Sequence, residues 1–208
     1  MPLSNSAYTK EDDRLSEEKT LLVGCGILSK EINYLIEKNN WRVETVFLDS
    51  SLHVDFNKLL SALEGALENC RGRKVLVFYG ECHPLIDKML EKAGTFRTEG
   101  QNCIDMLLGN EFFTEELSKG AFFLLEDWAL HWDRLVKNFY RGNIEVLRKI
   151  FQSDRKYILA LRTQCSQDFT LQAEHAAHET GLPLMWKDVT LEHLEKVLRE
   201  SLDKREMK

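Results

Sequence analysis

The stretch TLLVGCGILSKEINYLIEK, Thr20 to Lys38, decides the fold. An apolar run over 20–24 predicts a buried strand, and after a Gly-Cys-Gly turn apolar residues recur at helical spacing over 29–38. A strand that leads through a tight turn into a helix is the unit that builds parallel sheets covered by helices. This stretch therefore predicts an α/β protein.

The same alternation continues along the chain. Further strands are expected at 43–48, 74–79, 121–125, 156–161 and 182–186. Helices are expected from Asp55, a predicted N-cap, to Gly72, and at 84–92, 104–108, 112–117, 143–151, 168–180 and 190–204. The pattern predicts a single-domain, doubly wound, mainly parallel sheet of Rossmann-like or flavodoxin-like type over 20–189. A polar extension, 1–19, precedes this domain, and 190–208 forms a C-terminal helix that packs on it or extends from it.

Composition argues against several classes of protein. The 208 residues carry a formal net charge of −6, so a nucleic-acid-binding surface is not expected. No apolar run reaches the roughly 18 residues of a membrane helix, and the start of the chain is too polar for a signal peptide. Five cysteines without an export signal predict a reducing cytoplasm rather than a disulfide framework.

Three of the cysteines lie where this fold would bring them together. Cys25 follows the first predicted strand, Cys82 follows the strand at 74–79, and Cys103 opens a short apolar helix. In a parallel sheet the carboxyl ends of the strands share one edge, where ligands bind. Because thiolates bind zinc and iron–sulfur clusters, the arrangement predicts a three-thiolate metal site. The alternative is that these cysteines are small buried hydrophobes without function.

Other residues are candidates for parts of the same site. His83 could supply an acid or base, or a fourth ligand, although a polar residue that begins a helix would look the same. Cys165 is the reserve fourth ligand, and water or substrate would instead leave that position open. Asp105 could accept a proton or orient a ligand, or it could equally complement a helix dipole. Close approach of the backbone to a bound group is expected at three glycines: Gly24, Gly26 and Gly80.

Three further patterns suggest other sites. Residues 24–29 resemble a dinucleotide-binding turn with Asp49 as the ribose-binding acid, which makes a metal-free nucleotide or small-molecule module an alternative. His175 and His178 share a helical face, but neighbouring glutamates favour a solvated surface over a metal site. Four aromatic residues predict either a pocket wall over the sheet edge or part of the core: Phe122, Phe123, Trp128 and Trp132.

Three motifs together resemble a known family. They are CGIL after the first strand, YGEC after the third, and NCIDMLLG before the aromatic stretch. The chain is similar, over about Leu21 to Trp186, to the family of domains of unknown function numbered 1638, found largely in methanogenic archaea and other anaerobes. Members often occur beside corrinoid-dependent methyltransferase systems, so the resemblance implies a corrinoid or methyltransferase protein as partner. The family is uncharacterised and implies no catalytic residues.

The segment between the second and third cysteines departs from the family pattern. Members tend to carry a glycine-rich stretch and a basic residue before an Asp-Cys pair, whereas this chain has HPLIDKMLEKAGTFRTEGQNC. Asn102 replaces the acid, with Glu99 and Gln101 nearby. The three cysteines are kept, so the metal site is still expected, while substrate and partner stay open.

These observations together predict a cytoplasmic metal-binding protein with an open three-cysteine site. Because the resemblance implies an anaerobic host, which would tolerate an open cluster, [4Fe–4S] is placed slightly ahead of zinc. A small substrate that bears sulfur or a methyl group could be activated at the open position. The alternatives are a non-catalytic accessory protein of a corrinoid methyltransferase system and the metal-free nucleotide or small-molecule module. Whether the protein is an enzyme stays open.

Overall fold

The computed structural model describes residues 19–140 and 143–207. Within them, six strands form two parallel three-stranded sheets, of order β2-β1-β3 and β4-β5-β6. The α/β class and the parallel pairing predicted from the sequence are confirmed. The predicted polar extension, 1–19, lies outside the described residues apart from Lys19. The strands are β1 Thr20–Cys25, β2 Val43–Leu48, β3 Val75–Phe78, β4 Ala121–Leu124, β5 Tyr157–Arg162 and β6 Leu184–Asp188.

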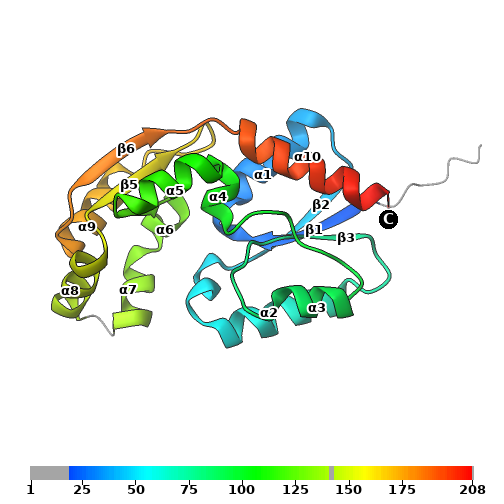
Figure 1. Ribbon diagram of the computed structural model, residues 1–208, viewed down its shortest axis with the longest axis horizontal. Coiled ribbons are helices and arrows are strands. Elements are labelled where there is room, and N and C mark those ends of the chain that lie inside the picture. The colour runs from blue at the N-terminus through cyan, green and yellow to red at the C-terminus, as the bar shows by residue number, and fades with distance from the viewer. Residues whose placement is uncertain (1–18, 141–142, 208) are drawn as a thin grey trace, which may run out of the picture.

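Helices connect the strands and cover both faces of the first sheet. In Figure 1, α1 and α10 lie on one face of that sheet and α2 and α3 on the other, as expected of a doubly wound fold. None of the helices in the described part of the chain combines the length and the apolar character needed to cross a membrane. The helices are η1 Gly26–Leu28, α1 Ser29–Asn39, η2 Ser50–Val54, α2 Phe56–Asn69, α3 Ile86–Lys92, α4 Cys103–Leu108, α5 Asn110–Ser118, α6 Glu126–Leu130, α7 Trp132–Tyr140, α8 Ile144–Asp154, α9 Thr170–Thr180 and α10 Glu192–Glu206.

The strands are divided between two sheets because the outer edge of β3 is already occupied. The Val77 N–H donates to the Phe96 carbonyl at 3.2 Å, and the Thr98 N–H donates to the Val77 carbonyl at 2.8 Å. The loop at 95–98 thus pairs with β3 where another strand would add. The chain forms α4 and α5 before β4 starts the second sheet.

The hydrophobic core continues from one sheet to the other. Leu159 and Leu161 of β5 pack into the core of the first sheet, whereas Ile158 and Ala160 pack into a second core with residues of α8 and α9. This division follows from the strand geometry, in which alternate side chains point to opposite faces. The second sheet therefore has one face on each core.

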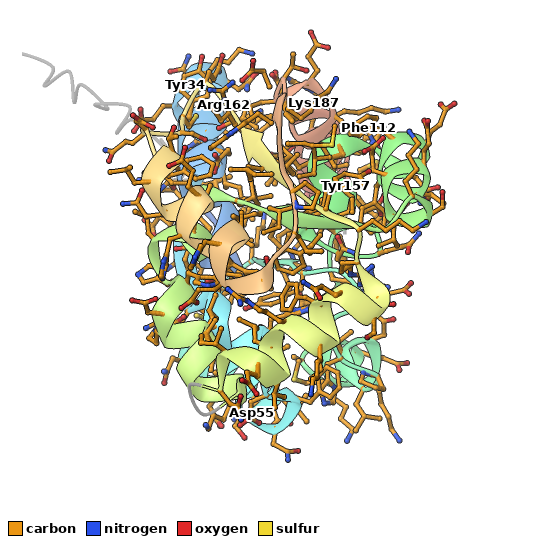
Figure 2. All side chains as sticks on the ribbon, turned by 90° about the vertical axis from the view of Figure 1, so that its left-hand side faces the viewer. Tyr34, Asp55, Phe112, Tyr157, Arg162 and Lys187 are labelled. Atoms are coloured by element: carbon orange, nitrogen blue, oxygen red, sulfur yellow. The ribbon has the colours of Figure 1, made fainter. Side chains whose placement is uncertain are left out.

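The helix α5 packs on the face of the second sheet that joins the first core. Figure 2 shows Phe112, Tyr157 and Lys187 close together in this part of the molecule. The Lys187 ammonium lies 5.2 Å from the centroid of the Phe112 ring, and the Tyr157 hydroxyl donates to Glu116 at 2.7 Å. These contacts join β5, β6 and α5.

Two helices that the sequence pattern left unassigned, α6 and α7, follow β4. The aromatic density of this segment hides a helical repeat, in which Trp128, Trp132, Leu135 and Val136 recur at three- and four-residue spacing. The last three are buried. Because α6 packs on η1 and η2, it brings the second half of the chain onto the carboxyl edge of the first sheet.

Polar side chains join the two halves at this edge. Glu31 is 5% exposed, and its carboxylate accepts a hydrogen bond from the Thr163 hydroxyl at 2.7 Å. Burial is the main cause that raises the pKa of Glu31, against the hydrogen bond from Thr163. The other pairs are Lys30 with Glu126 (2.7 Å), Arg134 with Asp49 (3.0 Å) and Ser50 with Asp127.

Replacement of Glu31 by Gln tests the cost of this buried carboxylate. Since the pKa of Glu31 is raised on folding, the folded protein holds the proton more tightly than the unfolded chain, and stability falls as the pH rises through that pKa. In Glu31→Gln the amide oxygen can still accept the hydrogen bond from the Thr163 hydroxyl, and the side chain is uncharged at every pH. We expect its free energy of unfolding in urea, relative to wild type, to be higher at about pH 7.5 than at about pH 4. An equal difference at both pH values would contradict this role of Glu31.

Candidate functional site

The three cysteines at the ends of distant segments line one cavity. Cys25 ends β1, Cys82 lies in the loop after β3, and Cys103 begins α4. They are 6%, 7% and 7% exposed, respectively. The cavity has a volume of about 270 Å³. The structure therefore brings together the residues predicted to meet at the sheet edge.

The thiols interact with one another. A hydrogen bond between Cys25 and Cys103 is the largest cause that lowers the pKa of Cys25 and also the largest that raises the pKa of Cys103. Burial raises the pKa of Cys82 to about 11, although the charge of Arg97 opposes it. The charges of the neighbouring thiolates raise the pKa of Cys82 and Cys103 further. Full ionisation of all three thiols is therefore costly unless a cation compensates it.

The spacing of the sulfur atoms bears on which metal could bind. With a Zn–S bond of about 2.3 Å, thiolates around one tetrahedral zinc lie about 3.8 Å apart. The sulfur atoms of Cys25, Cys82 and Cys103 do not all lie within 4.8 Å of one another. A single zinc ion would require these side chains to move closer together.

A buried hydroxyl without a partner lies near the thiols. Tyr79, directly after β3, is 2% exposed, and its Oη has no hydrogen-bond partner among the described residues. Burial raises the pKa of Tyr79, and the charges of Cys25, Cys103 and Cys82 raise it further, so its hydroxyl lies within electrostatic reach of all three. Because buried hydroxyl groups normally have a partner, an acceptor bound by the cysteines would fit this position.

Asn102 fixes the start of α4 and hence the position of Cys103. Its Oδ1 accepts hydrogen bonds from the N–H groups of Ile104 and Asp105 at 2.9 Å and 3.0 Å, as an N-cap does. Asp105, 4% exposed, accepts a hydrogen bond from the Gln101 N–H at 2.7 Å. Asp105 therefore orders the loop that carries Cys103.

The three glycines predicted to approach a bound group lie close to other segments of the chain. A Cβ at Gly80 would lie 2.3 Å from the Gln101 carbonyl oxygen, so the loop that bears Cys82 sits directly on the loop that bears Cys103. A Cβ at Gly24 would lie 3.0 Å from Cβ of Phe78, and one at Gly26 would lie 3.0 Å from the Leu48 carbonyl oxygen. The three glycines thus position the cysteine-bearing segments.

The second half of the chain supplies the apolar wall of the cavity. Phe113 and Leu117 come from α5, and Phe122, Phe123 and Trp128 come from β4 and α6. Three of the four aromatic residues considered as a pocket wall therefore line it, and the fourth, Trp132, packs in the second core. The cavity is therefore formed between the two halves of the chain.

His53, and not His83, lines the cavity. The ring centroid of His53 lies 6.2 Å from that of Trp128, and the protein around the ring partly desolvates it and lowers the pKa of the imidazole, although the residue as a whole is exposed to solvent. His83 accepts a hydrogen bond from the Leu85 N–H at 3.0 Å through Nδ1, and its ring meets Phe56 edge-on at 5.7 Å. The acid–base role predicted for His83 therefore draws no support from its position, which is that of a polar residue in a turn before a helix.

Cys165 lies away from the cavity. Its N–H donates to the Thr163 hydroxyl at 3.1 Å, and its pKa is raised by burial and then by the charge of Glu31. Cys25, Cys82 and Cys103 are not among the groups that shift the pKa of Cys165. Its position does not support the role of fourth ligand.

The turn at 24–29 is poorly suited to phosphate. The carboxylates of Glu126 and Asp127 lie on α6, which packs against η1 in this turn. Asp49 accepts a hydrogen bond from the Ser51 N–H at 2.8 Å and pairs with Arg134, and these contacts outweigh burial and lower its pKa. A nucleotide phosphate at this turn would meet negative charge, so the nucleotide alternative gains no support here.

His175 and His178 do not share a site. His175 Nε2 lies 2.9 Å from Asp133 Oδ1 and 3.7 Å from Glu179 Oε1, so Asp133, His175 and Glu179 form a small cluster. Asp133 and His175 are exposed, and Glu179 already accepts a hydrogen bond from Trp132 Nε1 at 2.8 Å. This matches the solvated surface expected of the segment.

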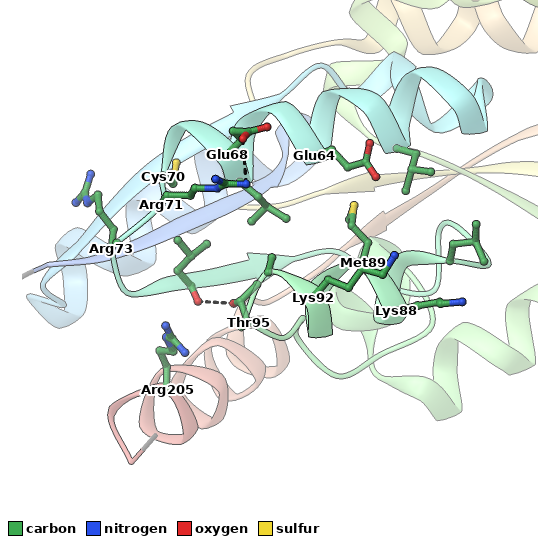
Figure 3. Close-up of a pocket in the computed structure, with 17 residues that line it drawn as sticks. Glu64, Glu68, Cys70, Arg71, Arg73, Lys88, Met89, Lys92, Thr95 and Arg205 are labelled. Atoms are coloured by element: carbon green, nitrogen blue, oxygen red, sulfur yellow. Dashed lines mark hydrogen bonds and ion pairs between the residues drawn. The ribbon is translucent and has the colours of Figure 1, made fainter.

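A larger cavity, of about 660 Å³, opens at the amino end of β3 (Figure 3). Lys92 and Arg205 lie in the last turns of α3 and α10, and Arg71 follows the end of α2 and pairs with Glu68 at 3.0 Å. Basic side chains at helix C-termini complement the helix dipoles. The charge of this cavity is therefore explained by the helix ends that meet there.

A family model matches residues 47–198, and it describes a protein of unknown function, DUF1638. The chain belongs to this family. The matched range contains Cys82 and Cys103 and begins after Cys25. No curated protein and no solved structure matches the chain. Because DUF1638 is defined without an activity, the functional argument rests on the geometry of the site.

Three residues of this DUF1638 site do not stand out in the sequence as the cysteines do. His53 follows the strand at 43–48, so the sheet-edge rule that selects the cysteines could also have found it. Asn102 carries a capping signal ahead of the short helix at 104–108, which could have marked it. Tyr79 ends an apolar run and is indistinguishable from core, because nothing local marks its hydroxyl as unpartnered.

Two glycine-to-alanine variants test the contact that aligns the cysteine loops. Gly80→Ala would place a methyl group 2.3 Å from the Gln101 oxygen, so we expect a loss of about 1–3 kcal/mol in the free energy of unfolding. Gly65 lies in α2, and a Cβ added there would meet nothing within 4 Å, so Gly65→Ala should raise stability by about 0.5–1 kcal/mol. Urea denaturation measures both. If both variants change the free energy of unfolding by the same amount and sign, the space at Gly80 can accommodate a methyl group.

Proposed function

We propose that Cys25, Cys82 and Cys103 bind one [4Fe–4S] cluster, with zinc as the alternative metal. The observation that carries this proposal is the meeting of three buried thiols, from distant segments, at one cavity. Thiolates are the usual ligands of such clusters. Packing alone would require only small apolar side chains at these positions.

Two features favour a cluster over a single zinc ion. Cysteines that bind a cubane attach to different irons, so their sulfur atoms stand farther apart than those around one tetrahedral ion, and these three do not all fall within 4.8 Å. Cys25 and Cys103, which are hydrogen-bonded to each other, would separate to reach different irons. The unpartnered Tyr79 hydroxyl would also gain an acceptor in a cluster sulfur. Hydrogen bonds to cluster sulfurs tune the reduction potential.

The proposed reaction would take place where the metal site faces the cavity. Three cysteines leave one iron without a protein ligand, and such an iron can serve as a Lewis acid toward a small substrate, which we take to bear sulfur or a methyl group. The wall on the other side of the cavity is apolar. His53 replaces His83 as the proposed acid–base residue, since it lines the cavity and an imidazole can both accept and donate a proton.

An accessory role is the alternative, in which the same thiols hold or carry metal while the protein docks on a corrinoid or methyltransferase protein. Its support is the family resemblance alone. Removal of the metal by a chelator separates a structural metal, which predicts unfolding, from a catalytic or carried metal, which predicts that the fold persists. In either case we propose a reducing cytoplasm, where free thiols are kept.

Metal analysis of protein purified without oxygen tests the proposal. We expect about four iron and about four acid-labile sulfide per chain, with a broad visible absorption. Cys25→Ser, Cys82→Ser and Cys103→Ser should each lose most of this iron, because each removes one thiolate ligand. Cys165→Ser is the matched control, since it removes a thiol outside the cavity and should keep the iron.

The same measurement can contradict the proposal in two ways. Stoichiometric zinc without sulfide would replace the cluster with a zinc site. Absence of both metals, or equal iron in the Cys165→Ser and Cys25→Ser proteins, would rule out a site built on the three thiols.

A further inference from the structure

The cavity beside the thiols has few polar groups, and no carboxylate is among the described residues that line it. Ser50 is already engaged, because its hydroxyl donates to Asp127. The His53 ring lies against Trp128 and keeps its nitrogens for the acid–base role proposed above. The Trp128 Nε1–H is buried and has no hydrogen-bond partner among the described residues, so it is a further donor in the lining. Asn102 and Arg155 add an amide and a positive charge, so the lining favours an acceptor group on the ligand.

Asn102 offers only donors to a ligand. Its Oδ1 is used by the N–H groups of Ile104 and Asp105, and this cap fixes the orientation of the amide. The Nδ2 group makes no hydrogen bond within the described part of the chain. An amide held in this way presents two N–H groups to an acceptor.

Arg155 is the one lining residue of the described chain that carries a fixed charge. It caps the end of α8, where its N–H donates to the Phe151 carbonyl at 2.7 Å. Its guanidinium lies 3.2 Å from Asp154, whose side chain is 72% exposed. Exposed pairs of this kind are weak, so the guanidinium can take a carboxylate that is held in better geometry.

The remaining wall selects an apolar body of limited size. Phe122, Phe123 and Trp128 present aromatic surface, and Ile27 and Ile104 present aliphatic surface. The volume of about 270 Å³ lies just below the range of roughly 300–1,000 Å³ usual for pockets of larger ligands. The space suits a molecule built on about one ring or one short branched chain.

We infer that this cavity binds a small apolar monocarboxylate, whose carboxylate is held by Asn102 and Arg155 and whose body lies against Phe122, Phe123 and Trp128. This names the substrate class of the proposed site and rests on the proposed function for its place next to a metal. The binding itself uses none of the three thiols. It is therefore testable in protein with or without metal.

Calorimetric titration of the full-length protein, as purified and after metal removal, tests the inference with benzoate as probe. Benzyl alcohol, which keeps the ring without the charge, and acetate, which keeps the charge without the ring, are the comparison ligands. We expect benzoate to bind at least about tenfold more tightly than either, because only benzoate combines the charged hydrogen bonds with the apolar contact of the ring.

Two variants assign the binding groups. Arg155→Leu removes the cation and keeps apolar bulk, whereas Asn102→Asp keeps a capping oxygen but replaces the amide donors by a negative charge. Each should weaken benzoate at least about fivefold and leave benzyl alcohol unchanged. Lys149→Leu is the matched charge control, since Lys149 is exposed on α8 outside the cavity, and it should bind benzoate like wild type.

The outcomes are distinct from those of the metal analysis. No benzoate binding, equal affinity for benzoate and benzyl alcohol, or equal benzoate affinity in Arg155→Leu, Asn102→Asp and wild type would each overturn the carboxylate site. Loss of iron binding with benzoate selectivity kept would remove the cluster and leave the carboxylate site in place.

Discussion

The parallel pairing of β1 with β3 is the constraint on which the site depends. With Gly24 opposite Phe78, both strands end at the same edge, and the chain leaves them through Cys25 on one side and the loop to Cys82 on the other. The close backbone contact at Gly80 then brings the loop of Cys103 onto the same point. Three segments far apart in the sequence thus deliver thiols to one place without a local metal-binding motif.

The second half of the chain turns this edge into a cavity. The helix α6 packs on η1 and η2, and the buried bond from Thr163 to Glu31 is one of the polar contacts that hold the halves together. The wall supplied by Phe122, Phe123 and Trp128 is apolar, while the first half supplies the thiols and His53. This division places the thiols and His53 on one half and the apolar surface of the cavity on the other.

Much of the fold and part of the site follow from sequence pattern. Continuous apolar runs identified the strands, and the rule that parallel strands end at one edge identified Cys25, Cys82 and Cys103. The division into two sheets could not be predicted, because it depends on the loop at 95–98 that bonds to the edge of β3. The unpartnered hydroxyl of Tyr79 depends on tertiary packing, which local sequence does not encode. Prediction therefore succeeds for strand ends and fails for the contacts made around them.

The most direct measurement is a crystal structure of protein grown without oxygen, with anomalous diffraction collected at the iron absorption edge. A cluster predicts a peak of iron density bonded to the sulfur atoms of Cys25, Cys82 and Cys103, with a cluster sulfur within hydrogen-bond reach of the Tyr79 hydroxyl. Protonated thiols in van der Waals contact with no metal between them, or iron bound elsewhere on the chain, would contradict the three-thiolate site.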